Sequence, residues 1–91
     1  MSAEAVATVP ITNRRGLHAR AAAKFVGVAA GFNAQITVER GGSVVSGCSI
    51  LGLMMLGAAL GSEIVIRATG QQAGEAVKAL TALVKAKFDE D

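Results

Sequence analysis

Apolar and polar positions along the chain follow two different periods in successive segments. Residues alternate as in strands over 5–12, 35–40, 43–46 and 63–68, whereas apolar residues recur at helical spacing over 19–30 and 73–88. A short apolar segment runs from Ser49 to about Leu56, with Ser49 as its N-cap and Gly57 closing it. The pattern therefore predicts seven elements in the order βαββαβα.

The order of these elements restricts the fold. A right-handed β–α–β crossover leaves a gap between the first two strands, which the fourth strand can fill. We expect an α+β open-faced sandwich, with a four-stranded antiparallel sheet in the order 1-4-2-3 and helices packed on one face. Pro10 cannot donate to a ladder, so the first strand should lie at an edge, and Gly41-Gly42 should form a hairpin turn.

The pattern also predicts where elements end and which side chains are buried. Gly31 should stop the helix over residues 19–30, and the last helix should end near Phe88, followed by a frayed acidic tail over residues 89–91. In the short apolar segment, Leu53 and Leu56 are the core candidates. The other large side chains of that segment should face away from the core: Ile50, Leu51, Met54 and Met55.

Composition excludes several classes of function. With 91 residues the chain is long enough for one domain, and 52% of it is hydrophobic. A net charge of +2 with no Trp, no Tyr and three Phe argues against nucleic-acid binding. Strong, salt-dependent binding of RNA or DNA would revive that hypothesis. One Cys and one His exclude an internal disulfide and an ordinary zinc site, so we expect no metal or cofactor, and Cys48 is read as a small core or helix-edge residue.

Targeting signals are weak as well. The first four residues carry neither a basic patch nor an apolar signal core. The apolar run over residues 50–60 is too short to span a bilayer. We expect a cytoplasmic protein without membrane insertion, and nothing in the sequence requires more than a monomer.

The chemistry of the chain concentrates around its one histidine. His18 lies directly before the alanine-rich helix, and Arg20 follows two residues later. A neutral imidazole is a nucleophile, a helix start offers the free N–H groups of Ala19 and Arg20 to an anion, and a guanidinium matches phosphate oxygens. A lone histidine is more often structural or merely exposed. Arg14 and Arg15 either attract an acidic partner or belong to a solvated turn.

Two segments carry a family resemblance. Residues 16–26 (GLHARAAAKFV) resemble the active-site segment of HPr, the histidine-containing phosphocarrier of the bacterial phosphoenolpyruvate-dependent phosphotransferase system. Residues 48–57 (CSILGLMMLG) resemble the regulatory serine of that family and the short helix after it. The resemblance implies a single HPr-like phosphocarrier domain over residues 1–91, with the same open-faced sandwich fold.

The resemblance also implies residue roles and partners. His18 would accept a phosphoryl group at its pros (Nδ1) nitrogen from enzyme I and pass it to an enzyme IIA-type protein, while Arg20 stabilises the phosphate. Such a protein is a stoichiometric carrier and not an enzyme. Ser49 would be the site of an HPr kinase/phosphorylase, although serine is also simply a good helix N-cap. The chain departs from the family pattern at Ala21, where many members have proline.

An apolar surface would complete the carrier. Ile50, Leu51, Met54 and Met55 either add to the core or form a docking surface, and methionine suits a surface that meets several partners. Three residues of the preceding long helix would complete this surface: Ala23, Lys24 and Gly27. Similarity favours the nitrogen-related regulatory branch over sugar uptake. The alternative function is a regulatory protein-binding module that acts through residues 50–55.

Overall fold

The computed structural model describes residues 4–90 of the chain. Its four strands are β1 (Glu4–Pro10), β2 (Gln35–Arg40), β3 (Ser43–Ser46) and β4 (Glu63–Thr69). Its helices are α1 (Ala19–Ala29), α2 (Ile50–Met55) and α3 (Ala73–Lys85), and a short turn, η1 (Lys87–Asp89), follows α3. The predicted order βαββαβα is confirmed.

The strands form one antiparallel sheet in the order β1-β4-β2-β3, as predicted. Strand β1 lies at an edge, where the missing amide proton of Pro10 costs no ladder bond. Gly41 and Gly42 connect β2 to β3 with φ angles of 56° and 87°, which glycine adopts readily and which suit the twist of a two-residue hairpin.

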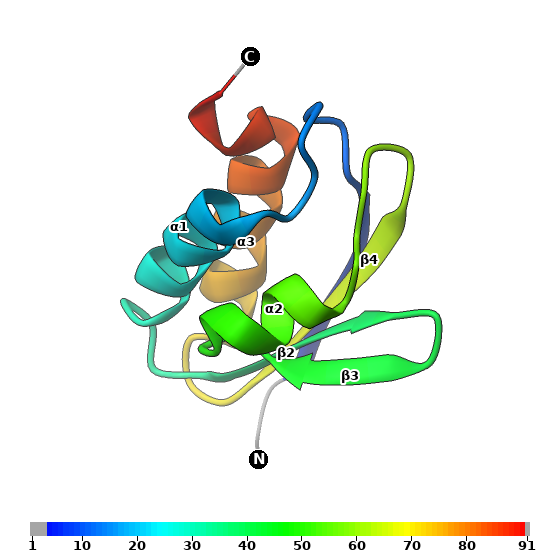
Figure 1. The fold of residues 1–91 in the computed structure, drawn as a ribbon. Coiled ribbons are helices and arrows are strands. Elements are labelled where there is room, and N and C mark those ends of the chain that lie inside the picture. The colour runs from blue at the N-terminus through cyan, green and yellow to red at the C-terminus, as the bar shows by residue number, and fades with distance from the viewer. Residues whose placement is uncertain (1–3, 91) are drawn as a thin grey trace.

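All helices cover the same face of the sheet, and α1 and α3 lie side by side (Figure 1). The sheet contributes alternate residues to the core, among them Val9, Val38 and Ile66. Helix α1 is closely packed because alanines line most of its buried face beside Phe25. Leu53 and Leu56 of the α2 segment are buried, and the large side chains beside them are exposed, as the sequence predicted.

One helix end agrees with the sequence prediction and another differs. Helix α1 ends at Ala29 with Ala30 as its C-cap, so Gly31 follows the end of the helix as predicted. Helix α3 ends at Lys85, earlier than predicted, and Phe88 reaches the core from η1 instead. Of the two alternatives predicted for Cys48, the helix edge is confirmed, because the residue is exposed and lies just before the N-cap of α2.

The acidic tail is not frayed over the part that the structure describes. Glu90 contacts His18 and Asn13, and the exposed Asp89 belongs to η1. The prediction for Asp91 lies outside the described residues. The end of the chain therefore contributes to the surroundings of the histidine.

Candidate functional site

A sharp loop between β1 and α1 positions His18. Gly16 has a φ of 66°, and a side chain there would meet the backbone of Ala58 at 2.5 Å, so only glycine fits without displacement. The N–H of Leu17 donates to the carbonyl of Ala58 at 2.9 Å, and the Leu17 side chain is buried. The residue before His18 is thus anchored to the segment that follows α2.

His18 is the N-cap of α1, but its side chain does not cap the helix. The first hydrogen bond within the helix runs from Ala22 N–H to the His18 carbonyl at 2.8 Å, so the earlier N–H groups have no acceptor inside the helix. The first turn holds no acidic residue and does hold Arg20. This end of α1 therefore presents N–H groups and a guanidinium that suit an anion.

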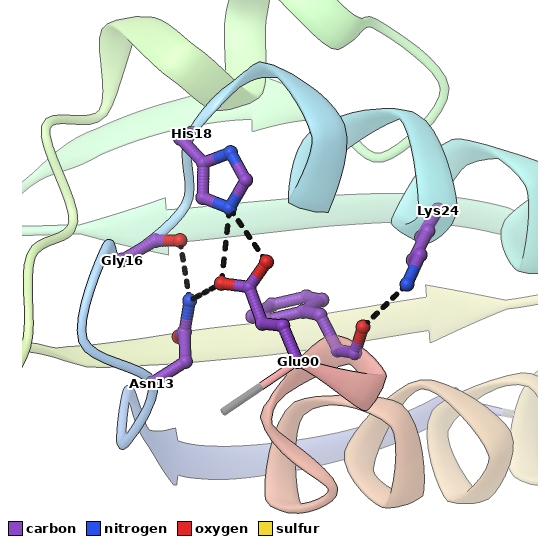
Figure 2. A network of polar contacts seen from close by, with 6 residues as sticks. Asn13, Gly16, His18, Lys24 and Glu90 are labelled. Atoms are coloured by element: carbon purple, nitrogen blue, oxygen red, sulfur yellow. Dashed lines mark hydrogen bonds and ion pairs between the residues drawn. The ribbon is translucent and has the colours of Figure 1, made fainter.

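The ring of His18 is held on one side by Glu90 (Figure 2). Its Nε2 atom lies 3.0 Å from both Oε1 and Oε2 of Glu90. Asn13 Nδ2 donates to Glu90 Oε1 at 2.8 Å and also to the Gly16 carbonyl at 2.8 Å. The Asn13 side chain is fully buried, so it links the β1–α1 loop firmly to the end of the chain.

A left-handed turn brings Glu90 to this position. Lys87, Phe88 and Asp89 have φ angles of 58°, 55° and 61°, which are uncommon outside glycine. Two contacts hold the turn: the Phe88 side chain is fully buried, and Lys24 Nζ donates to the Phe88 carbonyl at 2.7 Å (Figure 2). Burial of the aromatic ring offsets the backbone strain and directs the next residue toward His18.

The charges around the site are mostly positive. A surface pocket is lined by Arg14, Arg15, Arg20 and Glu90. The hydrogen bond from Asn13 and then the one from His18 lower the pKa of Glu90, although desolvation opposes them. Glu90 is therefore an ionised carboxylate at neutral pH, and three arginines remain close to it.

The remaining predicted residues fall into two places. Ala23 and Gly27 are exposed on α1, whereas Lys24 is half-buried through its contact with Phe88. Ser49 is the N-cap of α2, and its Oγ accepts a hydrogen bond from Gly52 N–H at 2.9 Å. The apolar side chains of α2 are exposed by 42% (Ile50), 67% (Leu51), 41% (Met54) and 75% (Met55), so they are not extra core.

Sequence reasoning did not find Asn13 or Glu90. Asn13 follows a predicted strand and resembles an ordinary turn residue, and Glu90 lies 72 positions from His18 in an acidic tail. One signal was present: Phe88 is a large apolar residue, and burial of its ring brings the residues next to it against the rest of the protein. A nucleophilic imidazole, a free helix start and nearby arginines can together carry a phosphoryl group.

Comparison with known proteins decides the family. The model of the family described as "PTS HPr component phosphorylation site" matches residues 5–86. The chain belongs to the HPr family. A phosphocarrier protein NPr of Shewanella violacea is 48% identical over 82 residues, which are 90% of each chain. A phosphocarrier protein HPr of Pseudomonas aeruginosa is 47% identical over 83 residues, covering 90% of this chain and 92% of that one.

Solved structures agree with this assignment. An HPr of Thermoanaerobacter tengcongensis superimposes with a TM-score of 0.91 at 42% identity, covering 96% of this chain and 98% of that one. HPr-family relatives are phosphocarrier proteins of the phosphotransferase system, which supports a phosphocarrier role. Within residues 4–90, no helix has the length and apolar character to cross a membrane, and no cluster of metal-ligating side chains occurs.

Proposed function

We propose that His18 accepts a phosphoryl group from phosphorylated enzyme I through Nδ1 and passes it to an enzyme IIA-type protein. The contact between His18 Nε2 and both oxygens of Glu90 carries this proposal. It leaves Nδ1 as the ring nitrogen that is available to a phosphorus atom, at the N-cap of a helix whose first N–H groups have no acceptor inside the helix.

The surroundings of His18 suit the phosphorylated state. The N–H groups of Ala19 and Arg20, together with the Arg20 guanidinium, would stabilise the phosphoryl oxygens. Alanine at position 21 does not prevent this, because Ala21 is fully buried and α1 begins at Ala19 as a regular helix. We expect the replacement of the family's proline to alter site geometry or partner preference, and not acceptor function.

The exposed apolar side chains of α2 would dock the partners. Ile50, Leu51, Met54 and Met55 are called the α2 patch here, and α1 packs against the same helix. Ala23 and Gly27 extend it on α1, while Lys24 would contribute mainly its aliphatic stem. Flexible methionines allow one surface to bind a donor and an acceptor in turn.

Regulation and cellular context complete the proposal. A phosphate placed on Ser49 by an HPr kinase/phosphorylase would lie at the start of α2 beside the α2 patch, and would weaken docking by adding negative charge.

We propose a monomeric, cytoplasmic carrier of the nitrogen-related branch, with sugar uptake as the alternative branch. Relatives named NPr and HPr match almost equally well, at 48% and 47% identity.

A phosphorylation assay tests the central role. The protein is incubated with phosphoenolpyruvate and active enzyme I, and its intact mass is recorded for the wild type and for His18→Ala. One acid-labile phosphoryl group on the wild type and none on the variant would support the proposal. No adduct on the wild type, with enzyme I shown to be active, would refute it.

A second candidate function is a regulatory protein-binding module, which the exposure of the α2 patch favours. The two functions separate at His18. His18→Ala should abolish transfer but leave binding through the α2 patch intact, whereas Met55→Asp should weaken binding and keep the imidazole. Binding of a partner that depends on Met55 but not on His18, in a protein that takes up no phosphoryl group, would favour the module.

A further inference from the structure

We infer that Glu90 is a positioning residue that keeps the proton of the His18 ring on Nε2, leaves the lone pair of Nδ1 free for phosphorus, and then pairs with the ring cation of the phosphorylated state. The inference rests on the proposed acceptor role of His18. It adds a residue from the opposite end of the chain to the reaction, joined to the ring by two contacts of 3.0 Å.

The first step follows from donors and acceptors. An ionised carboxylate can only accept hydrogen bonds, and both oxygens of Glu90 face Nε2. Nε2 must therefore be the donor, so in the neutral ring the proton is on Nε2 and Nδ1 has the lone pair. Figure 2 shows the other ring nitrogen on the side of the imidazole away from Glu90.

The second step concerns how the carboxylate is held. The Asn13 amide donates simultaneously to Glu90 Oε1 and to the Gly16 carbonyl, which fixes the carboxylate relative to the loop that positions His18. The buried Phe88 and the bond from Lys24 to its carbonyl hold the turn from the other side. Asn13 and Phe88 are buried, which explains why a residue so near the chain end can fix a ring orientation.

The third step is the charge balance of transfer. The Nδ1 lone pair forms the new N–P bond while the bond from phosphorus to the donor breaks, and that electron pair returns to the donor. The His18 ring becomes a cation that keeps its Nε2 proton, so no proton has to leave or arrive. Glu90 faces this proton and stabilises the developing charge, while Arg14, Arg15 and Arg20, which line a pocket together with Glu90, oppose the ring charge.

Two matched variants test the inference. Glu90→Gln keeps the shape of the side chain, but with its oxygen directed to Asn13 its NH₂ group faces Nε2 as a second donor. The variant therefore favours a proton on Nδ1 and removes the nucleophilic lone pair. Asp89→Asn is the control, because it neutralises the adjacent carboxylate, which is exposed, and asparagine tolerates the φ of 61° there.

Two measurements are made on each protein. The ring nitrogens are followed by ¹⁵N NMR of the unphosphorylated protein, and the rate of phosphoryl uptake from enzyme I is measured at fixed pH. We expect the proton on Nε2 in the wild type and in Asp89→Asn, and a shift of the proton toward Nδ1 in Glu90→Gln. Phosphoryl uptake should be about tenfold slower in Glu90→Gln alone. The effect is limited because a partly exposed carboxylate–histidine pair contributes less to the rate than a buried pair does.

Three results would overturn the inference. Unchanged ring spectra and unchanged uptake in Glu90→Gln would show that the contact has no role in transfer. Faster uptake would show that the carboxylate competes with the phosphoryl group instead of assisting it. A wild type that shows the Nε2–H form but takes up no phosphoryl group would refute the acceptor role of His18, and the role of Glu90 with it, while leaving the contact itself established.

Discussion

Replacement of Gly16 by alanine should be far more costly than the same change at another left-handed glycine. Gly16 has a φ of 66° and Gly41 a φ of 56°, so both substitutions place an alanine in left-handed geometry. That conformation costs an L-residue about 1–2 kcal/mol. An added Cβ at Gly41 would have nothing within 4 Å, whereas at Gly16 it would lie 2.5 Å from Ala58 O and 2.9 Å from Ala59 Cα.

The extra cost at Gly16 comes from backbone atoms that cannot rotate away. Ala58 O accepts the hydrogen bond from Leu17 N–H at 2.9 Å, so relief of the clash stretches or breaks that bond. Overpacking of this kind typically costs about 1–3 kcal/mol. We therefore expect Gly41→Ala to lower the free energy of unfolding by about 1–2 kcal/mol and Gly16→Ala by about 2–5 kcal/mol.

Urea titrations monitored by far-ultraviolet circular dichroism would measure the difference, since the chain has no Trp or Tyr. Gly16 lies in the β1–α1 loop two residues before His18, whereas Gly41 lies in the turn between β2 and β3. Phosphoryl uptake should therefore also fall in Gly16→Ala and remain unchanged in Gly41→Ala. Equal losses of stability in the two variants would refute the reasoning, since they would show that the Ala58 segment moves away without cost.

Three further predictions follow from burial, charge and capping. Phe88→Ala should lower the free energy of unfolding by about 3–5 kcal/mol in urea titrations, because the ring is fully buried, and a loss below about 1 kcal/mol would contradict this. The lowered pKa of Glu90 means that its stabilising effect is complete above its ordinary pKa of 4.5 and is lost as pH falls through the lowered pKa, so wild type and Glu90→Gln should converge in unfolding free energy in acid. Ser49→Ala should cost about 1 kcal/mol through loss of the bond to Gly52, measured by thermal unfolding, and Ser49→Asp should recover most of it; no recovery would argue against a capping role.

Much of the fold could be predicted because it depends on local pattern. The alternation of Ile36 and Val38, the edge position of Pro10 and the cap at Ser49 each express a constraint that acts within a few residues. The exposure of the α2 patch followed from simple geometry, because a helix of six residues cannot bury all of its large side chains.

The end of the chain could not be predicted, because nothing in its local sequence marks the turn. Phe88 follows Val84 at helical spacing, so the pattern continues α3 as far as Phe88, whereas the helix ends at Lys85. Three non-glycine residues with positive φ are unfavourable by themselves. They persist because the core accepts the Phe88 ring and Lys24 holds the Phe88 carbonyl.

The sequence by itself determined the elements, their order and the position of His18 at the start of a helix, because these depend on the period of apolar residues and on short-range capping. The sheet topology followed from that order through the right-handed β–α–β crossover. Only the tertiary structure decided which side chains surround the imidazole. Asn13 and Glu90 are separated by 77 positions and meet through one hydrogen bond. Such a pairing depends on how two distant segments pack on the same core, and no local pattern carries that information.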